Sequence, residues 1–110
     1  MREDEHLSTQ KKGKNLWFTV SGDVDHHTSK NIKQRIDSEV FITCPECIYL
    51  DLSRVEFMDS SGLGLILGRY RTATELGIGF ALIEPTDAVM RILKISGCDK
   101  LINIIKKKTG

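Results

Sequence analysis

The sequence has little net charge and no long apolar run. Its 110 residues hold 16 Lys and Arg against 15 Asp and Glu, for a formal net charge of +1. That balance offers no general electrostatic footprint for nucleic acid, and the few aromatic residues form no stacking stripe for single strands. No stretch approaches the ~18 apolar residues of a transmembrane helix. We therefore expect neither a nucleic acid nor a membrane as partner.

Paired cysteines and a secretion signal are also missing. The three cysteines are an odd number, and residues 1–6 are mostly charged instead of apolar. We therefore expect free thiols in a reducing cytoplasm. Cys44 and Cys47 have C-x-x-C spacing, but a structural zinc site needs four ligands and no second paired motif is present. We expect neither a metal nor a cofactor.

The motifs of nucleotide-binding and hydrolytic enzymes are not met. No glycine-rich phosphate loop ending in Gly-Lys-Ser/Thr is present. Residues 58–62 lack the first glycine of a G-x-S-x-G nucleophile elbow around Ser60. A triad of Ser60, Asp25 and His26 or His27 can be drawn, but adjacent charged residues in a loop are more often solvated. We therefore do not expect an enzyme.

The sequence does carry a regular alternation of strand and helix patterns. The predicted strands are residues 7–10, which form a weak edge strand, and residues 16–20, 48–52, 80–83 and 101–105. The first predicted helix begins at Thr28 or Ser29. The second runs from Ser60 to Leu76 and stops at Gly77, and the third begins at Thr86 or Asp87 and stops at Gly97. Their predicted apolar faces are Ile32, Ile36 and Val40, then Leu63, Ile66, Leu67 and Tyr70, then Val89, Ile92 and Leu93.

This order predicts one α/β domain. It implies a mixed, mostly parallel sheet of four to five strands, with right-handed crossovers and helices packed against it. The domain is predicted over residues 15–105, after a flexible or edge-strand segment at 1–14 and before a basic tail at 106–110. Sites in such sheets favour the carboxyl ends of strands, here the predicted loops 22–27 and 53–61.

The second of these loops holds two serines where a helix is predicted to begin. The first-turn amides of a helix lack internal partners, and its N-terminus carries partial positive charge. Ser60 or Ser61 can therefore cap the helix or, as a phosphoserine, be held by those amides. Gly62 and Gly64 each lower the stability of a helix by about 1 kcal/mol relative to Ala. A close approach by another group would explain why glycine stands there. The residues alone leave both interpretations of the serines open.

Two segments resemble those of bacterial anti-sigma factor antagonists of the STAS domain family. They are residues 22–28 and 57–70, with a weaker similarity at residues 89–97, and the resemblance covers roughly residues 15–105. It implies a protein that binds an anti-sigma factor serine kinase and so releases a sigma factor. It also implies that the kinase phosphorylates Ser60, which switches binding off, and that a serine phosphatase reverses this step.

The resemblance further implies which residues meet the partner. They are Asp23, Asp25, His26, Asp59, Ser60, Ser61 and Gly62, with Ser60 as the phosphoacceptor. The family often has Glu where this chain has Asp23, so that contact is expected to be shorter. We expect a monomer with a transient partner. The alternative is a STAS domain that is not phosphorylated and acts as a scaffold or small-ligand sensor.

A phosphate on Ser60 would change the local charge strongly. Without the four lysines at positions 100 and 106–108, the net charge of +1 becomes −3. A phosphoserine adds about −1.5 to −2, and Asp59, Asp23 and Asp25 would repel it. Losing a buried charge pair or burying a phosphate costs about 2–5 kcal/mol, a ~30- to several-thousand-fold change in affinity. That is enough for a switch without a change of fold.

Overall fold

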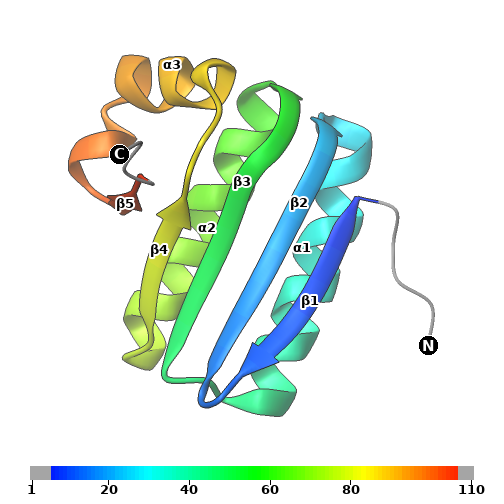
Figure 1. Cartoon of the computed structure of the whole chain (residues 1–110), viewed down its shortest axis with the longest axis vertical. Coiled ribbons are helices and arrows are strands. Elements are labelled where there is room, and N and C mark those ends of the chain that lie inside the picture. The colour runs from blue at the N-terminus through cyan, green and yellow to red at the C-terminus, as the bar shows by residue number, and fades with distance from the viewer. Residues whose placement is uncertain (1–5, 107–110) are drawn as a thin grey trace.

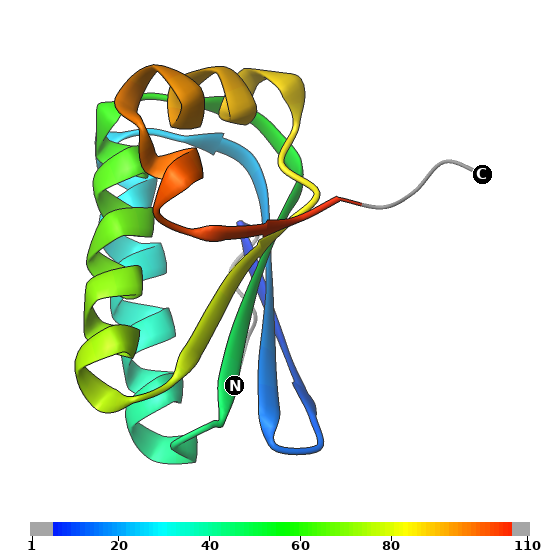
Figure 2. The ribbon, with the colours of Figure 1, turned by 90° about the vertical axis from the view of Figure 1, so that its left-hand side faces the viewer.

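Five strands form one sheet, and two long helices lie across one of its faces (Figures 1 and 2). The computed structural model describes residues 6–106. The strands are β1 (Leu7–Lys12), β2 (Asn15–Val24), β3 (Cys47–Met58), β4 (Gly79–Ile83) and β5 (Asn103–Ile105). The helices are α1 (His26–Thr43), α2 (Ser60–Leu76) and α3 (Asp87–Ser96), followed by a short 3-10 turn, η1 (Cys98–Lys100). Figure 2 shows α1 and α2 on the same side of the sheet and α3 across one end.

The sheet is mixed and mostly parallel, as the sequence predicts. Its strand order is β1-β2-β3-β4-β5; β1 is antiparallel to β2, and the other neighbours are parallel. The weakly predicted first strand is a full edge strand, paired from Leu7 opposite Val20 to Lys12 opposite Asn15. Its buried Leu7 ties this edge to the core. Because the other strands are parallel, their carboxyl ends point to one end of the sheet.

The core lies between the sheet and α1 and α2. Buried residues alternate along β2 and β3, as expected for strands with one face covered. The main members are Leu16, Phe18 and Val20 on β2, Ile48, Leu50 and Leu52 on β3, and Ile32, Ile36 and Val40 on α1. The three predicted core positions of α1 are thus confirmed.

The buried face of α2 differs from the predicted one. Of the predicted stripe only Ile66 is fully buried, whereas Leu63, Leu67 and Tyr70 lie at the margin of the core. The other buried residues of α2 are Gly62, Leu65, Arg69 and Ala73. This helix packs on α1 as well as on the sheet, so its covered face is turned towards α1.

Two strands run further than the sequence predicts. Residues 22–24 and 53–58, predicted as loops, belong to β2 and β3. Gly22 has a φ of +81° and sits at a register shift between these strands, so it marks an irregularity and not a strand end. The buried side chains of Val24 and Met58 hold both strand ends on the core. Each predicted loop therefore shrinks to a single residue, Asp25 or Asp59, between strand and helix.

One glycine lets α2 begin close to the strand ends. A Cβ atom at Gly62 would overlap the Met58 side chain and lie 3.1 Å from Cγ1 of Val24. A Cβ atom at Gly64 would meet nothing within 4 Å. The close approach expected at both glycines is therefore confirmed at Gly62 and wrong at Gly64.

We expect these two glycines to respond oppositely to alanine. Gly62→Ala should lower the free energy of unfolding by about 1–3 kcal/mol, because the new methyl group must displace buried side chains. Gly64→Ala is the matched control and should be neutral or stabilising by up to about 1 kcal/mol, because Ala is the better helix former. Urea unfolding of both variants measures the difference. Equal effects would contradict the packing role of Gly62.

Candidate functional site

Two helices begin side by side where β2 and β3 end (Figure 1). The parallel register places Val24 opposite Met58, and the amide of Asp59 donates to the carbonyl of Val24 at 3.2 Å. Because only Asp25 and Asp59 join these strands to their helices, the two aspartates stand at the same end of the sheet. The structure thus brings together residues 22–28 and the start of residues 57–70, the two segments that carry the family resemblance.

Asp25 caps α1, and the predicted cap at Thr28 or Ser29 is wrong. Its Oδ1 accepts hydrogen bonds from the amides of His27 and Thr28, each at 2.9 Å. The Thr28 hydroxyl oxygen in turn accepts from the Asp25 amide at 3.0 Å, which completes a capping box. This box gives partners to the backbone amides of Asp25, His27 and Thr28, so the helix begins at His26. The hydrogen bonds, that from Thr28 above all, lower the pKa of Asp25.

Asp59 caps α2 in the same way and leaves Ser60 free. Its Oδ1 accepts from the amides of Ser61 at 2.8 Å and Gly62 at 3.3 Å. The first-turn amides that could hold a phosphate are therefore occupied by the carboxylate of Asp59. Ser60 is the first helical residue; it is exposed, and its hydroxyl makes no hydrogen bond within residues 6–106. The interpretation of Ser60 as an N-cap is thus wrong.

The surroundings of Ser60 combine negative charge with an exposed ring. Asp23 is exposed near the end of β2, and the register places it opposite Phe57 of β3. Phe57 has 51% of its surface exposed. Asp23, Asp25 and Asp59 stand at this end of the sheet together with Phe57, and this end is called here the acidic surface around Ser60.

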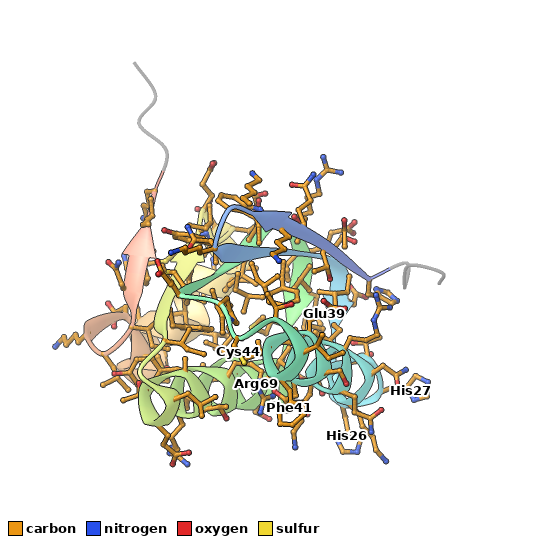
Figure 3. The ribbon with its side chains drawn as sticks, turned by 90° about the horizontal axis from the view of Figure 1, so that it is seen from below. His26, His27, Glu39, Phe41, Cys44 and Arg69 are labelled. Atoms are coloured by element: carbon orange, nitrogen blue, oxygen red, sulfur yellow. The ribbon has the colours of Figure 1, made fainter. Side chains whose placement is uncertain are left out.

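The structure does not assemble the triad considered from the sequence. His26 and His27 extend from the start of α1 into solvent (Figure 3). Within residues 6–106 neither imidazole is hydrogen-bonded to Ser60 or Asp25, and the Asp25 carboxylate accepts from backbone amides and Thr28. Ser60 therefore has no positioned base in this arrangement.

A groove that the sequence analysis missed begins beside Ser60. It lies between α1 and α2, encloses about 410 Å³, and is called here the α1/α2 groove. The residues that define it are His26, Lys30 and Lys33 of α1 and Ser61, Gly64 and Arg69 of α2. His26, Lys30 and Lys33 are four and then three residues apart, and this spacing in the sequence indicates one face of a helix. The burial of Arg69 has no such signal, because arginine is mostly exposed.

The described residues 6–106 show no metal site and no membrane span. Cys44 is exposed, Cys47 is half-buried, Cys98 is buried, and all three are free thiols. Nowhere in this range do three His, Cys, Asp or Glu side chains gather as metal ligands would. None of its helices has the length and apolar character needed to cross a membrane. The predicted basic tail at 106–110 lies outside the described range except for Lys106.

The chain is similar to a family of regulatory proteins. Residues 6–109 match the model of the STAS domain. An anti-sigma F factor antagonist of Paenibacillus polymyxa is 40% identical over 89 residues, which are 81% of this chain and 76% of that relative. The anti-sigma factor antagonist SpoIIAA in its unphosphorylated form has the same fold, with a TM-score of 0.81 and 25% identity over 94% of this chain and 89% of its own. The Bacillus cell fate determinant SpoIIAA in its phosphorylated form also shares the fold, with a TM-score of 0.75 and 24% identity over 94% and 92%.

The cap of α1 predicts a pH dependence of stability. Because the folded-state pKa of Asp25 is lowered, its stabilising contribution is complete above its unfolded pKa of about 3.9 and is lost as pH falls through the folded value. In Asp25→Asn, the side-chain oxygen can still cap the helix but carries no charge to titrate. We expect this variant to lose less stability than the wild type between about pH 5 and pH 2. Urea midpoints across that range measure this, and parallel curves would contradict it.

Proposed function

Because the chain belongs to the STAS domain family and to its anti-sigma factor antagonists, we propose that it binds an anti-sigma factor until Ser60 is phosphorylated. The free, exposed hydroxyl of Ser60 at the head of α2 carries this proposal. The relative from Paenibacillus polymyxa is an antagonist by name, and SpoIIAA exists in unphosphorylated and phosphorylated forms. These relatives support a switch that works by modification of one serine.

The unphosphorylated chain binds the anti-sigma factor through the end of the sheet around Ser60. Asp23 and Phe57 offer a carboxylate and an exposed ring on adjacent strands. The remaining contacts proposed there are Asp25, His26, Asp59, Ser61 and Gly62. An acidic surface around a ring fits a partner that presents basic side chains around an apolar pocket. Binding of that partner competes with its hold on a sigma factor.

Phosphorylation of Ser60 places a second anion beside the Asp59 carboxylate. The amides of Ser61 and Gly62 already donate to Asp59, so the phosphate meets occupied donors and a like charge. It adds about −1.5 to −2 charge on the surface that faces the partner. Burying that charge in the interface costs about 2–5 kcal/mol, which weakens binding ~30- to several-thousand-fold. Since Ser60 is exposed, the fold of the chain need not change.

The switch requires two enzymes and no catalytic residue of this chain. The anti-sigma factor itself is the proposed serine kinase, as the resemblance to anti-sigma factor antagonists implies. A serine phosphatase restores the free hydroxyl, and both reactions take place in the cytoplasm. The three free thiols of the described residues suit that reducing compartment.

The position of the phosphate can be measured directly. We expect incubation with ATP and a cognate anti-sigma kinase to add one phosphate, located on Ser60 by peptide mass spectrometry. Ser60→Ala should receive none, because the exposed acceptor is gone. Ser61→Ala is the matched control and should still be phosphorylated, since its neighbour is intact. Phosphate that persists in Ser60→Ala would contradict the assignment.

Binding by the same variants tests the switch. Ser60→Ala should bind the anti-sigma factor like the wild type, whereas Ser60→Asp should bind at least about tenfold more weakly, because it adds a charge beside Asp59. Isothermal titration measures both affinities. Equal affinities would overturn the switch. A stable complex without phosphorylation of the wild type would instead favour the unphosphorylated scaffold.

A further inference from the structure

The α1/α2 groove has two unlike walls. The wall from α1 carries His26, Lys30 and Lys33, and both lysines are exposed. These three positions span seven residues, about 10 Å along the helix. The wall from α2 includes Gly64 and Gly68, where a Cβ atom would meet nothing within 4 Å. A backbone can therefore approach α2 closely while its side chains face the cations of α1.

The floor of the groove holds a buried positive charge. Arg69 is only 7% exposed, although a guanidinium carries five N–H donors. Its Nε lies 2.8 Å from Oδ1 of Asp37, but the N–H does not align with that oxygen, so this ion pair lacks a hydrogen bond. No hydrogen bond of this guanidinium occurs within residues 6–106. Asp37 uses only part of the donor capacity of this guanidinium, so its other N–H groups can donate to a ligand in the groove.

Arg69 also separates the groove from an apolar pocket of about 220 Å³. That pocket lies further along the same two helices and is lined by Phe41 and Leu76 among others. Phe41 and Arg69 are labelled in Figure 3. Apolar surroundings strengthen the attraction between the guanidinium and an anion. A planar carboxylate can accept two parallel hydrogen bonds from a guanidinium, which makes it the natural occupant.

The net charge of the groove determines which sign of charge its ligand carries. Lys30, Lys33 and Arg69 contribute positive charge, and Asp37 is the acidic residue paired with Arg69. The excess is positive, in contrast to the acidic surface around Ser60. Because Ser61 lines one end of the groove, a protein that reaches the Ser60 hydroxyl also reaches this groove.

We propose that the α1/α2 groove binds an acidic segment of the anti-sigma factor, with one carboxylate on Arg69 and others on Lys30 and Lys33. This inference rests on the proposed function and adds a second contact of opposite charge to the contact around Ser60. The backbone of the segment lies over Gly64 and Gly68. Two contacts of opposite sign orient the partner, so that its kinase centre faces Ser60.

Charge reversal on α1 tests this surface. In Lys30→Glu/Lys33→Glu, two exposed cations become anions, and the variant should keep its fold because both side chains are solvated. The matched control is Arg91→Glu/Lys94→Glu on α3, also exposed, with the same spacing and the same change of net charge. Each variant loses one cation that stands four residues from an acidic residue of its helix, Lys33 from Asp37 or Arg91 from Asp87. Circular dichroism and urea unfolding compare the folding of the two variants.

The measurement is the affinity of the unphosphorylated full chain for the anti-sigma factors of its own organism, at low and high salt. We expect the α1 variant to bind at least about tenfold more weakly and to lose much of the salt dependence, and the α3 variant to stay within about twofold. Carbodiimide coupling, which joins amines to adjacent carboxylates, should link Lys30 or Lys33 to Asp or Glu of the partner.

The outcomes test the groove and the proposed function separately. Equal affinities of the α1 and α3 variants, or coupling of the partner elsewhere only, would overturn the groove as a docking surface. The proposed function would then still stand if the wild type binds and Ser60→Asp does not. If the wild type binds none of these anti-sigma factors, both proposals are overturned.

Discussion

The parallel pairing of β2 with β3 as far as Val24 and Met58 is the constraint on which the site depends. It brings two strand ends to one level, where the amide of Asp59 also donates to the carbonyl of Val24. Both helices must then begin within one residue of the sheet. Gly62 makes this possible, because any side chain at that position would meet Met58 and Val24. The position of Ser60 follows from this packing and not from a flexible loop.

The same arrangement assigns different tasks to neighbouring polar residues. Asp25 and Asp59 each use a carboxylate to satisfy the first amides of a helix, so they are structural as well as charged. Ser60 follows the second cap and is excluded from it, which leaves its hydroxyl for chemistry. A cap residue next to the proposed acceptor also means that a phosphate added to Ser60 would find the helix N-terminus already neutralised. Stability and the proposed switch therefore depend on the same turn of backbone.

The two long helices contribute two surfaces of opposite charge. Their N-termini lie in the acidic surface around Ser60, and the seam between them opens into the α1/α2 groove with its lysines and buried Arg69. The burial of Arg69 costs solvation, and Asp37 on the facing helix offsets only part of that cost. A guanidinium retained under those conditions suggests a role in recognition. Both surfaces lie on one pair of packed helices, so the proposed partner would meet them in a fixed relation.

Local patterns in the sequence determined the order of the elements, the bounds of α2 from Ser60 to Leu76, and the stops at Gly77 and Gly97. These features depend on spacing, capping and glycine conformation within a few residues. The resemblance to a known family singled out Ser60, which physical reasoning alone left open. Only the tertiary structure decided that β2 and β3 continue past Gly22 and Leu52, because pairing between distant segments outweighs a local break. It also decided that Arg69 is buried, because that burial arises where α2 packs against α1 and Asp37, far away in sequence.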